Sequence, residues 1–200
     1  MASTSTEICN SALIKVGAER ISSLTENNKR AILCNEQYNK IRKKLLSSHP
    51  WNFSTKRVQL TRDAAVPEFE FDFQYSIPSD CLRIFRVKND GNFMYRIEAG
   101  KLLTNESEVY IEYAKDETDV SLFAEYFTEY LAHALAYDLC YAIVQSNAYK
   151  QSLKEDVLES RREAKNSNAQ EGSPREFDIS TWTNARMEGH TDLLRSGRHP

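Results

Sequence analysis

A histidine and three carboxylates stand close together between residues 125 and 138, and they are the side chains best suited to chemistry in this 200-residue sequence. A histidine oriented by a carboxylate can act as a general base, and paired carboxylates can divide acid and base roles. His133 and Asp138 are five residues apart, which turns them to somewhat different sides of a helix. Glu125 and Glu129 share a helix face, but such pairs are usually solvated. Because a histidine in a largely apolar helix is more often a core or interface residue than a catalyst, the pattern favours structural roles.

Motifs for cofactors and metals are missing from the sequence. It contains no glycine-rich phosphate or dinucleotide loop, no HExxH and no GxSxG. Metal-ligand spacing is also missing among the histidines and cysteines, which are His49, His133, His190, His199, Cys9, Cys34, Cys81 and Cys140. Three of the cysteines fall on apolar faces of predicted helices, which is typical of buried free thiols in a reducing compartment. We therefore expect a protein that is not an enzyme, with no catalytic residues, no cofactor and no metal.

A basic run in the second predicted helix could instead contact phosphate groups. The run comprises Lys40, Arg42, Lys43 and Lys44. Cations near a helix C-terminus are favoured by the macrodipole, and Ile41 and Leu45 tie the same helix to a core, so we favour a structural role. The alternative stays open: a nucleic-acid-binding module that uses this basic end of the helix and whose affinity falls steeply with salt.

The net charge of -3 hides an asymmetry along the chain. Residues 1–60 carry 10 Lys and Arg against 4 Asp and Glu, whereas residues 61–130 carry 7 against 15. These segments could neutralise each other within one chain or between copies, and no dominant positive field marks a generic DNA binder. The first residues lack a signal-peptide pattern, and the longest apolar-rich stretch, residues 122–144, is interrupted by charges. We therefore expect no membrane span and synthesis in a cytoplasm.

Helical periodicity occupies both ends of the sequence. Residues 4–17 predict a first helix that ends at a glycine, and a second helix is expected from an N-cap at Thr25 to about residue 47. The apolar stripe of the second helix is Ala31, Cys34, Tyr38, Ile41 and Leu45. A third helix, from about residue 119, is apolar on several sides and is predicted to be central, and a polar fourth helix ends near residue 170.

Between residues 53 and 114 the periodicity changes to two, which predicts five or six short antiparallel strands. Hairpin turns are expected at Ala99-Gly100 and at residues 89–92. One predicted strand has aromatic residues at alternate positions, namely Phe69, Phe71, Phe73 and Tyr75. These rings could stack on bases, but the carboxylates between them would repel a nucleic-acid backbone, so we predict a packed strand face.

The order of elements predicts an α+β protein. We expect an antiparallel helical bundle with a small antiparallel β domain inserted between its second and third helices, plus an extended C-terminal arm. The bundle is assigned to residues 1–52 and 115–170, the β domain to residues 53–114 and the arm to residues 171–200.

The junction between bundle and β domain is predicted to be a structural corner. Pro50 cannot extend a helix, so the second helix must end before it. Trp51 and Phe53 are predicted to fix this corner against the bundle.

The arm is predicted to be an interface. It lacks a sustained period but carries large apolar residues, which are Phe177, Ile179, Trp182 and Met187. Apolar anchors spaced in this way dock on a neighbouring surface, either of the same chain or of another chain.

Several groups of residues together resemble one family. They are Ala12-Leu13 before Gly17, Ile21 and Leu24, Ala31, Tyr38 and Leu45-Leu46, and His49-Pro50-Trp51-Asn52-Phe53. With "YSIPSDCLRIFRV" (residues 75–87) and "LAHALAYDLC" (residues 131–140), they resemble the tail tubular protein A family, the head-to-tail adaptors of short-tailed bacteriophages. The order of elements matches over residues 8–145, and the C-terminal part departs from the family pattern.

This resemblance implies a structural virion protein that forms a homo-oligomeric ring, typically of twelve copies. The ring would join the portal protein to the tail nozzle, with genomic DNA passing through its lumen without sequence-specific binding. It implies a place in the virion at the portal vertex, after synthesis in the host cytoplasm, and no membrane partner. A ring needs two different complementary faces on each subunit, which the basic first segment and the acidic middle segment could supply.

Overall fold

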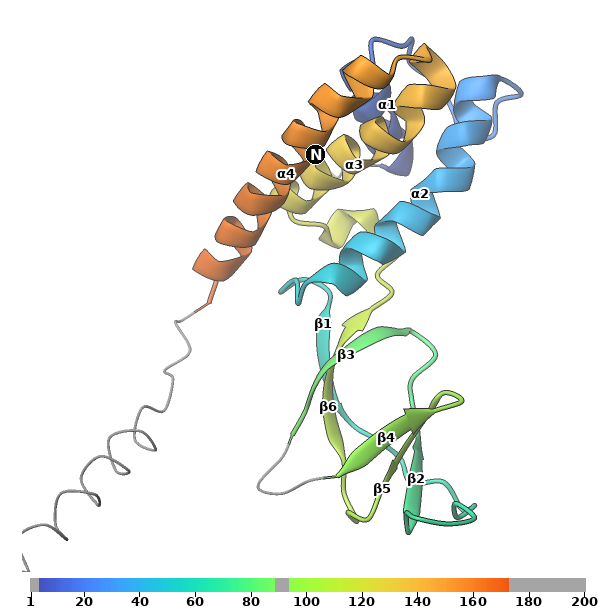
Figure 1. The fold of residues 1–200 in the computed structure, drawn as a ribbon, viewed down its shortest axis with the longest axis vertical. Coiled ribbons are helices and arrows are strands. Elements are labelled where there is room, and N and C mark those ends of the chain that lie inside the picture. Colours follow the sequence, from blue (N-terminus) through green and yellow to red (C-terminus); the bar gives the residue numbers. More distant parts are fainter. Residues whose placement is uncertain (1–3, 89–93, 173–200) are drawn as a thin grey trace, which may run out of the picture. The chain divides into compact units, whose positions relative to one another are not determined.

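The structure, a computed structural model, describes residues 4–88 and 94–172. Within these residues the protein is α+β, with four α-helices and two small antiparallel sheets (Figure 1). The helices are α1 (Ser5–Lys15), α2 (Lys29–Ser48), α3 (Glu125–Val144) and α4 (Asn147–Gln170), with a 3₁₀ turn η1 (Val120–Leu122) before α3. The strands are β1 (Thr55–Gln59), β2 (Phe73–Ser76), β3 (Cys81–Val87), β4 (Tyr95–Glu98), β5 (Lys101–Thr104) and β6 (Tyr110–Lys115). All six strands therefore follow α2 and precede α3 in the sequence.

The first helix begins and ends as its sequence predicts. Thr4 and Glu7 form a capping box, in which each side chain accepts a hydrogen bond from the other residue's backbone N–H. The helix is followed by Gly17 at a φ of +71°, a left-handed conformation that glycine adopts without strain.

The second helix starts later than predicted. Its N-cap is Asn28, whose side-chain oxygen accepts a hydrogen bond of 2.8 Å from the N–H of Ala31. Thr25 instead lies in a turn that Glu26 organises by accepting the N–H groups of Ser22 and Ser23. The prediction of Thr25 as N-cap is therefore wrong, because a local carboxylate turn occupies this segment. The helix ends at Ser48, as expected from the proline at position 50.

The central position expected for the third helix is confirmed by its burial. Eight residues of α3 are buried, and they are Phe127, Tyr130, Leu131, Ala132, Leu135, Ala136, Leu139 and Cys140. The helix proper begins at Glu125, later than predicted, because residues 120–122 form η1 with Asp119 as its cap. Gln145, at a φ of +56°, then ends the helix in a left-handed conformation.

Two three-stranded sheets account for the predicted strands. One has the order β1-β6-β3 (sheet A) and the other has the order β2-β5-β4 (sheet B). The turn between β4 and β5 falls at Ala99 and Gly100, as predicted, and both residues have positive φ, +47° and +75°. Such a two-residue turn matches the twist of antiparallel strands. The second predicted turn, at residues 89–92, lies outside the described residues.

The strand predicted from the alternating aromatic residues is shorter than expected. β2 begins only at Phe73, and Phe69 is 79% exposed. The chain turns at Glu70, whose φ of +70° is incompatible with a strand, and the N–H of Phe71 donates to the carbonyl of Phe69. The prediction of a packed strand face from Phe69 onwards is therefore wrong for Phe69.

Buried apolar side chains form two separate clusters. The larger one draws on α1, α2, α3 and α4 and includes Trp51, and Cys9, Cys34 and Cys140 are buried in it as free cysteines. The smaller one lies among the strands and combines Ile111 and Tyr113 of sheet A with Tyr75 and Leu102 of sheet B. Of the described helices, none is both long and apolar enough to cross a membrane.

Candidate functional site

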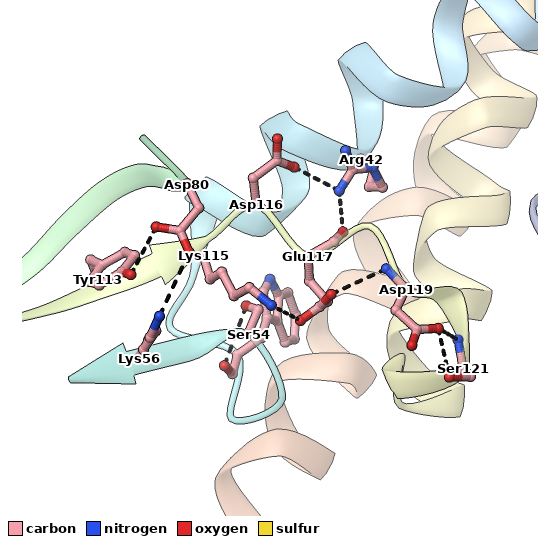
Figure 2. Close-up of polar contacts among 11 residues, drawn as sticks. Arg42, Ser54, Lys56, Asp80, Tyr113, Lys115, Asp116, Glu117, Asp119 and Ser121 are labelled. Atoms are coloured by element: carbon pink, nitrogen blue, oxygen red, sulfur yellow. Dashed lines mark hydrogen bonds and ion pairs between the residues drawn. The ribbon is translucent and has the colours of Figure 1, made fainter. Parts of the chain in front are cut away.

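Polar side chains meet where the C-terminal half of α2 faces the end of β6 (Figure 2). Asp116, directly after β6, receives Arg42 Nη1 on one carboxylate oxygen at 2.7 Å and Lys43 Nζ on the other at 2.9 Å. The Arg42 side chain is only 2% exposed and also donates to the carbonyl oxygen of Glu117. Burial works to raise the pKa of Asp116, but the hydrogen bond from Lys43 and the charge of Arg42 outweigh it and hold that pKa below its usual value.

The segment after Asp116 continues this network towards α3. The buried carboxylate of Glu117 accepts Lys115 Nζ at 2.8 Å and the N–H of Asp119 at 3.2 Å. Asp119 in turn accepts the N–H of Ser121 at 2.9 Å and caps η1. The hydrogen bond to Glu117 raises the pKa of Lys115. The connection from β6 to α3 is thus fixed by side chains of its own residues and by Arg42.

Asp80, just before β3, closes the network on the side of the strands. It accepts the hydroxyl of Tyr113 at 2.9 Å, and Lys56 Nζ lies 3.9 Å away (Figure 2). Its carbonyl oxygen accepts the N–H of Asp116 at 2.7 Å. Burial, followed by the hydrogen bond to Asp80, raises the pKa of the Tyr113 hydroxyl. Sheet A is therefore joined to the same connection that holds Arg42.

The network holds geometry and offers little for catalysis. Asp116 is ionised and engaged by two cations, and Glu117 is buried with its oxygens occupied, so neither offers a free general base. Within the described residues, no group of three or more His, Cys, Asp and Glu side chains could hold a metal ion. What the arrangement does is keep α2, β6 and the start of α3 in one fixed relation.

The corner after α2 lies beside this network. Trp51 is fully buried, its indole N–H donates to the carbonyl of Leu45 at 2.9 Å, and its ring meets Phe127 at 5.3 Å edge-on. Phe53 packs on the same Phe127 ring at 4.9 Å. The carbonyl of Pro50 faces the side-chain amide of Asn168 at 3.3 Å. These contacts hold the segment between α2 and β1 against α3.

The histidine of α3 contacts the carboxylate of Glu129. His133 Nε2 lies 3.1 Å from Glu129, which also pairs with Lys15 at 2.6 Å, whereas Asp138 and Glu125 are exposed. Burial works to raise the pKa of Glu129, but Lys15 and His133 outweigh it and keep that pKa low. The structure thus pairs His133 with Glu129, and among the described residues His133 forms no hydrogen bond or ion pair with Asp138.

His49 packs in the corner. Its ring meets Trp51 edge-on at 4.8 Å, and Nε2 lies 3.4 Å from the side-chain amide of Asn168. Burial lowers the pKa of His49, and the charges of Lys165 and Arg161 lower it further. His190 and His199 lie outside the described residues, as do the predicted interface residues Phe177, Ile179, Trp182 and Met187.

The basic run of α2 has a different explanation from the one expected. The last turn of α2 contains no basic residue, so the run lies too far from the end for the macrodipole to explain it. Arg42 and Lys43 are instead engaged by Asp116, while Lys40 and Lys44 are exposed. The macrodipole interpretation is therefore wrong, and ion pairs with Asp116 explain Arg42 and Lys43 instead.

Charge complementarity between the first and middle segments is met at least in part within the chain. The ion pairs that join them are Lys15–Glu129, Arg42–Asp116, Lys43–Asp116, Lys56–Asp80 and Arg57–Glu112. Sequence reasoning missed Asp80, Asp116 and Glu117. The sequence did indicate that Arg42 has a partner. Arg42 stands four residues after Tyr38 and so falls on the buried stripe of the helix, where a charged side chain requires a partner.

No protein-family model matches this sequence, and no curated protein matches it either.

Proposed function

We propose that this protein is a structural virion component, a ring-forming head-to-tail adaptor that joins a phage portal to the tail and lets DNA pass through its lumen. In this proposal the helices form an antiparallel bundle, residues 53–114 are a β domain inserted between the second and third helices, and residues 171–200 are an arm. The protein acts without catalysis, and its partners are further copies of itself, the portal protein and the tail nozzle.

The observation that carries the proposal is the joint around Trp51. The residues of strongest resemblance, from His49 to Phe53, connect α2 to β1 and pack on Phe127 of α3. The neighbouring pair of Arg42 and Asp116 ties the end of β6 to α2. A connector that transmits load between a capsid and a tail needs its two parts held in a fixed relation, and buried aromatic and charge contacts provide this.

Electron microscopy of the full chain mixed with portal rings tests the proposal. We expect a stoichiometric complex in which twelve copies form one ring on each portal, while the isolated chain stays monomeric. A mixture in which no ring forms on the portal, or a ring whose lumen is lined by Lys and Arg, would contradict it, because a cationic lumen would retain DNA.

The arm is tested by deletion of residues 171–200. We expect the truncated chain to keep the circular dichroism and urea unfolding of the full chain but to attach to portal rings at least tenfold more weakly. The arm is proposed to order on assembly, so its anchors add binding free energy only in the complex. Normal assembly of the truncated chain would remove the arm from the proposal and leave the rest standing.

The second candidate is the nucleic-acid-binding module that uses the basic run of α2, residues 40–44. It has lost support, because Arg42 is buried and Lys43 is engaged by Asp116. A filter-binding titration at low salt decides between the two functions. Affinity that falls steeply with salt and disappears in a Lys40→Ala and Lys44→Ala double variant would favour the module.

A further inference from the structure

The outward face of sheet A is basic around one buried carboxylate. Arg57 and Arg86 are the register partners of Glu112 on its two sides, so the three side chains lie in one row across the sheet. The next row contains Tyr110, with Lys88 Nζ 5.3 Å from the centre of its ring. A pocket of about 270 Å³ is lined by these five residues and their neighbours. We call Arg57, Arg86, Lys88, Tyr110 and Glu112 the socket.

Arg86 gives the socket a positive charge that the carboxylate of Glu112 does not neutralise. Arg57 lies 3.2 Å from the carboxylate of Glu112, whose side chain is 7% exposed. Arg86 is exposed, and within the described residues it forms no ion pair. The outward face of sheet A therefore presents the exposed Arg86 in one row, and Lys88 beside the ring of Tyr110 in the next row. This combination suits an acidic ligand that also carries an apolar group.

The loop before β2 presents a ligand of this composition. Phe69 is 79% exposed and stands between Glu68 and Glu70. The turn at Glu70, with its φ of +70°, and the hydrogen bond from Phe71 N–H to Phe69 carbonyl at 2.9 Å fix the local backbone. A left-handed conformation at a residue other than glycine is strained, and such strain is often kept where a segment is presented to a partner. We call Glu68, Phe69 and Glu70 the knob.

The charges of the knob are also incompletely neutralised. Glu70 lies 3.3 Å from Arg96 of β4, whereas Glu68 forms no ion pair within the described part of the chain. A phenylalanine left in water loses the free energy that burial would give. The knob thus has both an apolar group and a negative charge that a partner could satisfy.

The knob and the socket lie on opposite sides of the smaller buried cluster. In β6, Ile111 and Tyr113 enter the cluster, so Tyr110 and Glu112 between them face away from it. In β5, Leu102 enters the cluster, while Leu103 lines a pocket of about 390 Å³ together with the knob. A knob therefore cannot reach the socket of its own chain, but it can reach that of a second copy.

We propose that the knob of one copy inserts into the socket of the next, and that this contact repeats around the ring. Phe69 lies against Tyr110 and the aliphatic stems of the socket arginines, and Glu68 pairs with Arg86. The contact is head-to-tail, because knob and socket are different surfaces, and such contacts generate rings when the rotation closes. This inference rests on the proposed function and names the surfaces by which the subunits associate.

A second copy fits the socket better than a nucleic acid does. The carboxylate of Glu112 lies at the centre of the basic row and would repel a phosphate group. The knob places its apolar ring beside Glu68, so this charge can reach Arg86 while the ring fills the middle.

Exchange of charge between the two surfaces tests the proposal. We expect Arg86→Glu and Glu68→Arg each to reduce the number of rings on portals at least tenfold, counted by electron microscopy with the full chain. An equimolar mixture of these two variants should assemble like the wild type, because every knob then meets a socket of opposite charge in an alternating ring. The Phe69→Ala variant should assemble at least tenfold less than the wild type. Lys154→Glu, a reversal of an exposed charge on α4, is the control and should assemble normally.

The outcomes separate this inference from the function on which it rests. Wild-type protein that forms no ring on portals would overturn both. Wild-type rings together with normal assembly of the Arg86→Glu and Phe69→Ala variants would overturn the knob and socket alone. If Arg86→Glu assembled normally but lost binding to a single-stranded oligonucleotide, the socket would be a nucleic-acid site and the inference would be wrong.

Discussion

Two arginine–carboxylate pairs have their carboxylate in β6 or directly after it, and they differ in which partner is buried. In the first pair, Arg42 of α2 is 2% exposed and its partner Asp116, directly after β6, is 20% exposed. In the second pair, Glu112 of β6 is 7% exposed and its partner Arg57 of β1 is 73% exposed. The first arginine cannot exchange its partner for water or for another chain, whereas the second can.

This difference separates the residues that hold the fold from those available for association. A buried charge contributes by being paired, and the loss of its partner is costly. An exposed charge without an ion pair among the described residues, such as that of Arg86, contributes little to stability, since water solvates it. The same division applies to aromatic side chains, because Trp51 is fully buried while Phe69 is 79% exposed. Substitutions at these positions should therefore affect stability or assembly, but not both.

Replacement of Trp51 should have the largest effect on stability. We expect Trp51→Ala to lower the free energy of unfolding by about 3 to 5 kcal/mol, because it leaves a cavity beside Phe127 and removes the hydrogen bond to Leu45. Urea unfolding followed by circular dichroism measures this. Tyr141→Ala, at a residue 52% exposed on α3, is the control and should cost less than about 1 kcal/mol. Equal losses in both variants would mean that Trp51 does not anchor the corner.

Removal of the partner of Arg42 should have the next largest effect. Asp116→Ala should lower the free energy of unfolding by about 3 kcal/mol, because it leaves the guanidinium group buried without a carboxylate. The double variant Arg42→Met and Asp116→Leu should recover most of this loss, since no unpaired charge remains. If the double variant were less stable than Asp116→Ala, the unpaired charge would not be the cause.

The sequence predicts the elements well and their partners poorly. The end of α2 before Pro50, the turn at Ala99-Gly100 and the central α3 all follow from local periodicity and backbone preference. The pairing of Arg42 with Asp116 does not, because the two residues are far apart in the sequence and meet only through the path of the strands. The exposure of Phe69 was missed for another reason, since a single positive φ at Glu70 ends an alternation that otherwise predicts a strand.

The contacts of Asp116 with Arg42 and Lys43 should also weaken in acid. The pKa of Asp116 is depressed in the folded protein, so its contribution to stability is present above the unfolded pKa of about 3.9 and is lost as the pH falls through the folded value. We expect the urea midpoint of the wild type to fall between about pH 4 and pH 2, and that of Asp116→Ala to fall less over the same interval. The difference should be smaller than the loss caused by Asp116→Ala at neutral pH, because the protonated side chain still fills its site and its carbonyl oxygen can still accept a hydrogen bond. Parallel curves for the two proteins would show that other carboxylates, such as Glu129, account for the acid sensitivity.

Substitution of the exposed residues Phe69 and Arg86 should have the smallest effect on stability. Phe69→Ala and Arg86→Ala should each change the free energy of unfolding by less than about 0.5 kcal/mol, because their side chains are exposed and their removal opens no cavity in the chain. The urea curves of these variants should therefore overlay that of the wild type, while Trp51→Ala and Asp116→Ala shift theirs. A loss of more than about 1.5 kcal/mol in Phe69→Ala would place Phe69 within the folded chain's own packing, and its exposure would then no longer argue for a partner.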